Sequence, residues 1–294
     1  GASQTTRIEN SLVVLKVLAI LLFIFVGATA LHLKNYIPFI PKYHMNADGS
    51  AFGGWQGVYA GVSQIFLSYI GFDSIAANSA EAKNPKRTMP LGIVGSLVIA
   101  VVLFSAVTLV LVGMHPYTEY ANNAAPVSWA LSEAGFPLVS QVISIVADAG
   151  MFIALLGMIL AGSRLIYAFG RDGMLPKVLG QVDKRENPTN ALIVLTTVAI
   201  IIGAFFPFTF LAQLISAGTL IAFVFVSIGM FALRPREGKD LPQASYKMPF
   251  YPILPALGAI GSIIVFENLD SLAKLYCFIW ILLGIVIYSL YGAK

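Results

Sequence analysis

Charged residues are scarce in this sequence: they make up 11% of its 294 residues, whereas apolar residues make up 58%. A soluble domain typically carries about 25% charged residues, and fewer than half of its residues are apolar. The chain has too few polar side chains to cover its own surface, which excludes a soluble globular protein. Lipid is therefore the expected solvent, and we predict an all-α integral membrane protein.

Cysteine is almost absent, because Cys277 is the only one. A single cysteine excludes a disulfide framework and a CxxC metal pair. The three histidines lack metal-ligand spacing, and the sequence contains no HExxH, GxSxG or Walker motif. We therefore expect no enzymatic activity, no metal ion and no cofactor. The basic residues are dispersed over several loops, which argues against a nucleic-acid partner.

Long apolar runs dominate the sequence instead. A helix needs about 20 apolar residues to cross the hydrocarbon core of a bilayer, which is ~30 Å thick. Runs of roughly that length predict eight membrane spans, of which the fifth and the seventh are short. They lie at residues 11–33, 56–79, 91–114, 136–162, 190–207, 209–233, 251–268 and 275–291.

Basic residues orient these spans, because cytoplasmic loops carry an excess of lysine and arginine. With residues 1–10 inside the cell, 14 basic residues fall in inside segments, and only Lys34, Lys42 and Lys274 fall outside. This bias predicts that both ends of this chain lie on the cytoplasmic side. We expect a multi-pass protein of the cell (plasma) membrane.

A carboxylate lies near the centre of the second span, where Asp73 follows Ile70-Gly71-Phe72. Charged side chains inside a bilayer are costly and generally mark functional sites. Glycine weakens a helix, and a helix broken at membrane depth offers its backbone groups to a cavity or a ligand. One interpretation is therefore the substrate site of a transporter. The alternative is that Gly71 allows two helices to pack closely while Asp73 bonds to a neighbouring helix.

Two further charges lie within spans. Lys16 lies two turns into the first span. It either snorkels to the cytoplasmic interface or is a desolvated amine that gains and loses a proton. Asp148 precedes Ala149-Gly150 in the fourth span, where it either lines a substrate path or caps a local kink. The residues alone leave these alternatives open.

Three ordered groups of motifs stand out along the chain. They are YIGFDSIA at 69–76 with EAKNPKR at 81–87 and PLGI at 90–93, SRLIYA at 163–168 with RDGMLP at 171–176, and LISAGTL at 214–220. These motifs resemble helix 6 with its exit loop, the end of helix 8, and helix 10 of the amino acid–polyamine–organocation superfamily. The eight spans match helices 5–12 of that family in order. The chain is especially similar to the bacterial branched-chain amino-acid permeases of the cationic-amino-acid-transporter-like branch.

The resemblance implies a LeuT-type fold of two inverted five-helix repeats, with helices 1 and 6 broken around the substrate, plus two extra helices. Residues 1–294 would form one transmembrane domain. In it, 1–33 would be the last helix of the first repeat, 56–233 the second repeat and 251–291 the two extra helices. Helices 1–4 have no counterpart here. We therefore expect a fragment, or part of a longer protein, that needs helices 1–4 of the same polypeptide in order to transport.

The resemblance also implies a set of substrate-binding residues, namely Leu67, Ile70, Gly71, Phe72 and Asp73. Backbone carbonyls around Leu67 and Ile70 would receive the substrate's ammonium group, and Gly71 would mark the unwound point. Leu67 stands where the family often has an aromatic gate, which suits leucine, isoleucine or valine. Lys16 aligns with a helix-5 lysine of sodium-independent members, which implies a proton as the coupling ion.

These features predict a secondary active permease that takes up branched-chain neutral amino acids with protons by alternating access. One alternative is a carrier of cationic amino acids or polyamines, in which Asp73 and Asp148 both face the substrate. An alternative of another class is a non-transporting membrane scaffold or channel-like protein. Such a protein has no need of a broken helix with a central acid.

Overall fold

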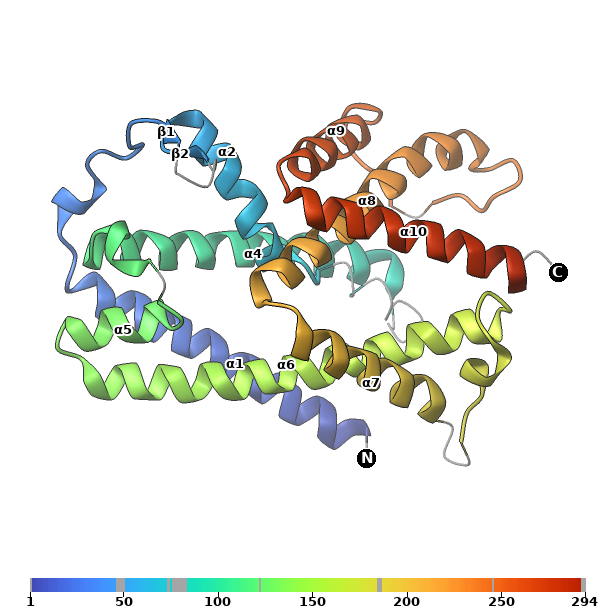
Figure 1. Ribbon diagram of the computed structural model, residues 1–294, viewed down its shortest axis with the longest axis horizontal. Helices are drawn as coiled ribbons and strands as arrows, with labels where there is room; N and C mark the ends of the chain where they lie inside the picture. Colours follow the sequence, from blue (N-terminus) through green and yellow to red (C-terminus); the bar gives the residue numbers. More distant parts are fainter. Residues whose placement is uncertain are drawn as a thin grey trace. The chain divides into compact units, whose positions relative to one another are not determined.

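The computed structural model describes residues 2–45, 51–72, 75, 84–121, 123–183, 187–244 and 246–291. Its α-helices and strands (Figure 1) are, in chain order, α1 (Ala2–Ala28), β1 (His44–Met45), β2 (Ala51–Phe52), α2 (Gly54–Ile65), α4 (Pro85–Met114), α5 (Pro126–Glu133), α6 (Pro137–Arg171), α7 (Thr189–Phe205), α8 (Phe208–Leu233), α9 (Ile253–Glu267) and α10 (Ser271–Tyr291). Single 3-10 turns include η1 (Leu33–Tyr36), η2 (Phe66–Tyr69) and η4 (Tyr117–Tyr120). Apart from the short antiparallel hairpin β1–β2, the described chain is built from helices, as predicted.

Five of the described helices are long and apolar enough to cross a membrane, namely α1, α4, α6, α8 and α10. The helices α7 and α9 are also apolar but contain only 17 and 15 residues. They correspond to the predicted fifth and seventh spans, which are the short ones in the sequence. The remaining predicted span, 56–79, begins as α2 and η2. Seven of the eight predicted spans thus coincide with apolar helices. The remaining one, the second span at 56–79, is interrupted after η2.

Proline marks the start of several helices. Pro85, Pro126 and Pro137 are the first residues of α4, α5 and α6, where the missing N–H of proline has no helical partner to lose. Pro207 immediately precedes α8. The helix that starts at Pro126 lies between two predicted spans, 91–114 and 136–162, where no helix was predicted. An eight-residue helix leaves no apolar run that would reveal it in the sequence.

The first of two compact units comprises Gly1–Ile40 and Val98–Ala161. Its buried core is contributed by α1, α4, α5 and α6, through Phe23, Val110, Met114, Ala130, Leu131 and Ile143. The helices α1 and α4 approach closely at Gly27, because a Cβ there would lie 2.5 Å from the Val110 side chain. The phenol of Tyr36 in η1 also donates to the Leu109 carbonyl of α4 at 2.7 Å. These contacts hold α1 and the segment after it against α4.

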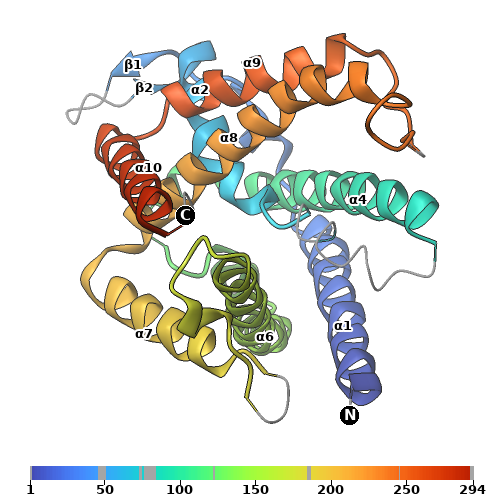
Figure 2. The same ribbon diagram turned by 90° about the vertical axis from the view of Figure 1, so that its right-hand side faces the viewer.

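The second unit comprises Pro41–Leu97 and Gly162–Lys294. Within it, α8 lies alongside α9 and α10 in both views (Figures 1 and 2). The buried core of this unit consists of Ala217, Leu220, Leu269 and Cys277. Phe66 of η2 packs against this core, so the segment that follows α2 is anchored to the centre of the unit.

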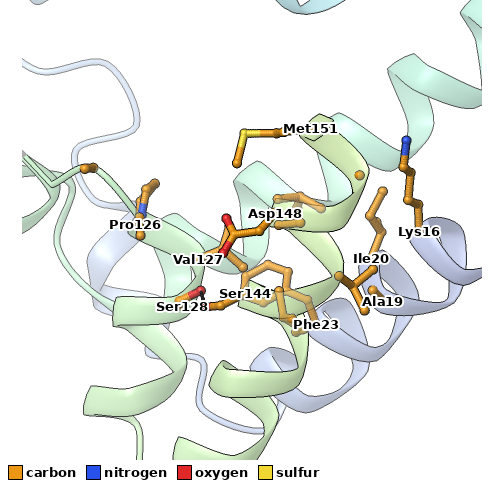
Figure 3. A pocket seen from close by; sticks show the side chains of 17 residues that line it. Lys16, Ala19, Ile20, Phe23, Pro126, Val127, Ser128, Ser144, Asp148 and Met151 are labelled. Carbon is orange, nitrogen blue, oxygen red and sulfur yellow. Dashed lines mark hydrogen bonds between the residues drawn. The ribbon is translucent and has the colours of Figure 1, made fainter. Parts of the chain in front are cut away.

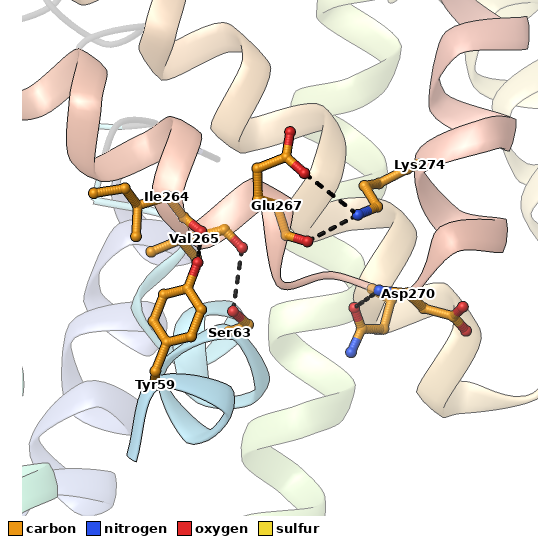
Figure 4. Close-up of polar contacts among 8 residues, drawn as sticks. Tyr59, Ser63, Ile264, Val265, Glu267, Asp270 and Lys274 are labelled. Carbon is orange, nitrogen blue, oxygen red and sulfur yellow. Dashed lines mark hydrogen bonds and ion pairs between the residues drawn. The ribbon is translucent and has the colours of Figure 1, made fainter. Parts of the chain in front are cut away.

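The last turn of α9 receives hydrogen bonds from α2 within this unit (Figure 4). The final four carbonyls of an α-helix have no donor within the helix, and an unsatisfied carbonyl in a bilayer is costly. The Tyr59 hydroxyl of α2 donates to the carbonyl of Ile264. One turn later, the buried Ser63 hydroxyl donates to the carbonyl of Val265 at 3.1 Å. Two carbonyls at the end of α9 are therefore satisfied by another helix.

The other two terminal carbonyls of α9 are satisfied from the chain that follows it. The N–H of Leu269 donates to the carbonyl of Phe266 at 3.1 Å. The amine of Lys274 donates to the carbonyl of Glu267 at 2.8 Å, and Figure 4 shows this contact beside the ion pair of the same two residues. The complete set of donors allows α9 to end after about 22 Å, short of the ~30 Å hydrocarbon core.

Candidate functional site

The predicted interruption of the second span occurs at the end of α2. The helix ends at Ile65 and is followed by the single turn η2, after which the N–H of Ile70 donates to the Leu67 carbonyl at 3.2 Å. Ile70 is extended, with φ −69° and ψ 140°, and Gly71 has a φ of +120°. Glycine adopts such a φ without the steric cost that a Cβ would bring. The predicted interruption is therefore confirmed for the residues up to Phe72, and Gly71 allows the backbone conformation found there.

Phenylalanine side chains hold this segment against α8. The ring of Phe223 meets the ring of Phe66 edge-on with centroids 6.2 Å apart, and its centroid lies 5.7 Å from that of Phe72. Aromatic pairs of this kind contribute about 0.5–1.5 kcal/mol beyond their buried area. Phe223 was not predicted as part of the site, because one aromatic residue in an apolar helix has no pattern that distinguishes it.

Four of the five predicted substrate-binding residues lie on this one segment of the second unit. Leu67, Ile70, Gly71 and Phe72 are each half-buried. The fifth, Asp73, lies outside the described residues. The structure thus gives the four residues a common, non-helical backbone, and their role in substrate binding stays a prediction.

A cavity of about 590 Å³ lies in the first unit, among α1, α4, α5 and α6 (Figure 3). Most of the residues that line it are apolar. The polar side chains among them are Lys16, Ser128, Ser144 and Asp148. The predicted coupling residue Lys16 therefore shares a cavity with Asp148, although the two residues belong to different helices and lie far apart in the sequence.

Gly150 is the position at which α6 makes room for Lys16. A Cβ on Gly150 would lie 2.7 Å from Cε of Lys16 and 3.5 Å from its Nζ. The lysine stem therefore lies directly against the backbone of α6, and its side chain is half-buried. This contact favours a cavity-lining amine over one that snorkels to the cytoplasmic interface.

The serine hydroxyls fasten α5 to α6 at the wall of the cavity. The Oγ atoms of Ser128 and Ser144 are 2.6 Å apart, and the Ser140 hydroxyl donates to the carbonyl of Ser128 at 2.7 Å. In Figure 3 the carboxylate of Asp148 lies on the side of the cavity that Ser128 lines. The described residues contain no group of three or more histidine, cysteine, aspartate or glutamate side chains that could hold a metal ion.

An aromatic cluster lies outside the spans, where the segment between α4 and α5 packs against Trp129 of α5. The ring centroid of Tyr120 lies 5.3 Å from that of Trp129, and the ring of His115 lies 4.9 Å from the same tryptophan. The Tyr120 hydroxyl donates to the carbonyl of Leu111 at 2.6 Å. Burial, followed by the charge of the neighbouring Glu119, raises the pKa of Tyr120 to about 12. Both effects disfavour the phenolate.

This pKa shift predicts a loss of stability at high pH. Because the pKa of Tyr120 is higher in the folded chain than the ordinary value of 10.0, its protonated phenol stabilises the fold below pH 10. That contribution declines as the pH rises through 10 to 12. In ultraviolet difference titrations, the wild type minus Tyr120→Phe should show one tyrosine that ionises near pH 12. A difference spectrum with a midpoint near pH 10 would contradict the assignment.

The chain matches the sequence model described as "Amino acid permease" over residues 1–273. It is 65% identical, over its whole length and 63% of the relative, to the branched-chain amino acid permease BcaP of Lactococcus lactis subsp. cremoris (strain MG1363). It is 35% identical, over its whole length and 61% of the relative, to the methylthioribose transporter of Bacillus subtilis (strain 168). It is 33% identical, over 82% of its length and 40% of the relative, to the chloroplastic cationic amino acid transporter 9 of Arabidopsis thaliana.

These relatives agree on the kind of protein and differ in the substrates that they are named for. All three are named as permeases or transporters, and none is named as an enzyme. The chain spans about three fifths of the length of the two bacterial relatives. The similarity to bacterial branched-chain permeases and to cationic amino acid transporters, expected from the motifs, is confirmed.

Proposed function

The chain belongs to the amino acid permease family, and from this premise we propose that it is part of a secondary transporter that takes up leucine, isoleucine and valine. The main support is the interruption of the second predicted span, where α2 ends at Ile65 and Gly71 has a φ of +120°. Transporters use such interruptions to offer backbone groups to a substrate near the middle of the bilayer. The name of the 65% identical relative supports the branched-chain class.

The amino group of the substrate would bind where the chain leaves the helix. Backbone carbonyls near Leu67 and Ile70 are the proposed acceptors, since carbonyl oxygens satisfy an ammonium group. The half-buried side chains of Leu67 and Phe72 offer apolar surface to an aliphatic substrate. We assign Asp73 the supporting role that the family resemblance implies, as the acidic residue after the break.

The carboxylate of the substrate would bind elsewhere in the same polypeptide. The bacterial relatives are longer than this chain, and we propose that family helices 1–4, which the chain does not contain, supply that half of the site. The complete transporter would lie in the plasma membrane, with both ends of this chain in the cytoplasm, as the excess of inside lysine and arginine indicates.

We assign proton coupling to Lys16. Its side chain lines the cavity against Gly150, where the charged and the neutral amine differ in the solvation that they need. Protonation would then favour one of two packings of α1 on α6, and transport would follow the alternation between them. No resident cofactor is needed, because the proton itself is the coupling ion.

Competition uptake with the full-length protein tests the substrate class. Proteoliposomes should accumulate labelled leucine when the outside is made acidic. A tenfold excess of unlabelled isoleucine or valine should reduce initial uptake at least about fivefold, while arginine and methylthioribose should leave it nearly unchanged. A site lined by aliphatic groups discriminates against the charged side chain of arginine by its desolvation cost. Methylthioribose has no ammonium group for the backbone carbonyls to bind.

The other possible outcomes of this competition assay would each favour a different function. Strong inhibition by arginine would favour a carrier of cationic amino acids. Inhibition by methylthioribose alone would favour the substrate named for the 35% identical relative. Absence of uptake for every labelled solute, with correctly folded protein in the vesicles, would favour a non-transporting membrane scaffold.

A further inference from the structure

Two opposite charges lie at the same depth of the first unit. Lys16 is 12 residues before the end of α1 at Ala28, and Asp148 is 11 residues after the start of α6 at Pro137. At ~1.5 Å per residue, these separations are about 18 Å and 17 Å. Both helix ends lie on the outer side in the predicted topology. Each charge therefore lies inside a hydrocarbon core ~30 Å thick.

No other charged side chain lines the cavity among the described residues. The helix α1 contributes Lys16, α6 contributes Asp148, α4 contributes Val107, and the remainder is apolar except for Ser128 and Ser144. Lys16 and Asp148 do not form an ion pair with each other in the described part of the chain. Lys16 and Asp148 thus line one cavity without direct contact. Asp148 is exposed, and in Figure 3 its carboxylate lies toward Val127 and Ser128.

The electrostatics of this space couple the two groups. With an ammonium and a carboxylate the cavity is neutral overall, and ions at membrane depth are costly unless they are compensated. If Lys16 alone lost its proton, an uncompensated carboxylate would remain. If the proton moved to Asp148, an amine and a carboxylic acid would remain, and both ions would disappear together. The second route leaves the cavity neutral both before and after the transfer.

We propose that Asp148 accepts the proton that Lys16 releases during transport. In this step one N–H bond of Lys16 breaks, its electron pair stays on Nζ, and an O–H bond forms on the carboxylate of Asp148. The cavity is large enough for several waters, and the hydroxyls of Ser128 and Ser144 can hydrogen-bond to them. The proton can therefore cross by way of water, and direct contact between the two side chains is not required.

This inference rests on the proposed function, and its test separates net proton transport from substrate exchange. Counterflow, in which labelled leucine exchanges for unlabelled leucine, needs no net proton transfer. Asp148→Asn in the full-length protein should keep counterflow within about twofold of wild type. At a gradient of one pH unit, wild type should accumulate leucine about tenfold, and Asp148→Asn should accumulate less than about twofold. Asp148→Glu should restore accumulation.

Glu133→Gln is the matched control, because Glu133 is an exposed acid of the same unit and does not line the cavity. It should behave as wild type in both assays. Full accumulation by Asp148→Asn would overturn the proposal. Loss of counterflow in Asp148→Asn, with wild-type melting temperature, would also overturn it, because Asp148 would then act on the substrate or on the conformational change. If wild type itself fails to accumulate leucine, it is the proposed function that fails.

Discussion

Lys16→Ala in the full-length protein is expected to abolish the dependence of leucine accumulation on an imposed proton gradient. One pH unit supplies about 1.4 kcal/mol, so a transporter that moves one proton per substrate can reach a tenfold concentration ratio. Without the Lys16 amine that lies against Gly150, no lysine or arginine side chain among the described residues of the cavity can bind and release a proton. The ratio should therefore fall from about tenfold to about onefold, as measured by labelled leucine in proteoliposomes at defined inside and outside pH.

Lys34→Ala provides the comparison for this experiment. Lys34 is an exposed lysine of η1 that does not line the cavity. Its removal should leave both the rate and the pH dependence of uptake unchanged. Undiminished, gradient-dependent accumulation by Lys16→Ala would remove the coupling role assigned to that residue. The branched-chain substrate class would remain open to the competition assay.

Gly150→Ala is expected to impair transport without destabilising the fold. The added Cβ would lie 2.7 Å from Cε of Lys16, closer than two carbon atoms can approach without a shift. The end of a lysine side chain is flexible and can move away, and alanine is the better helix former by about 1 kcal/mol. The amine would leave its position, and misplacement by about 1 Å is enough for large losses of rate. We expect gradient-driven uptake to fall roughly tenfold, with an unchanged or higher melting temperature.

The same helix contains a control for that substitution. A Cβ on Gly157 would meet no atom within 4 Å, so Gly157→Ala makes the same chemical change in α6 without touching Lys16. This variant should gain the helix-propensity benefit and keep full uptake. Equal losses in the two variants would show that α6 requires glycine for a reason other than room for the lysine.

The sequence identified single unusual residues well, but could not show which of them meet. Lys16 and Asp148 were visible because charges inside apolar runs are rare. Their common cavity depends on how α1 packs beside α6, which no local pattern encodes. The break at Gly71 was predictable because glycine and nearby polar residues contradict a continuous apolar helix. The helix α5 was missed because its eight residues produce no long apolar run, although Pro126 marked its start.

Contacts with the backbone were the least predictable part of the site. Tyr59 and Ser63 lie four residues apart, so they share one face of α2. That spacing indicates a polar contact, but their partners are carbonyls of Ile264 and Val265, which every residue type possesses. The role of Phe223 could not be predicted either, because it depends on contacts with the rings of Phe66 and Phe72, which are distant in the sequence.

The hydrogen bonds from α2 to the last turn of α9 have a consequence for motion. If α2 slid along α9, the carbonyls of Ile264 and Val265 would lose the donors supplied by Tyr59 and Ser63. The carbonyl of Val265 would keep the N–H of Asn268 at 3.2 Å, but the carbonyl of Ile264 would be left without a donor, which costs several kcal/mol in a bilayer. We therefore expect α9 and α2 to travel as one rigid body. The bending that opens and closes the substrate site is then confined to the short hinge after Ile65, where the chain is no longer an α-helix.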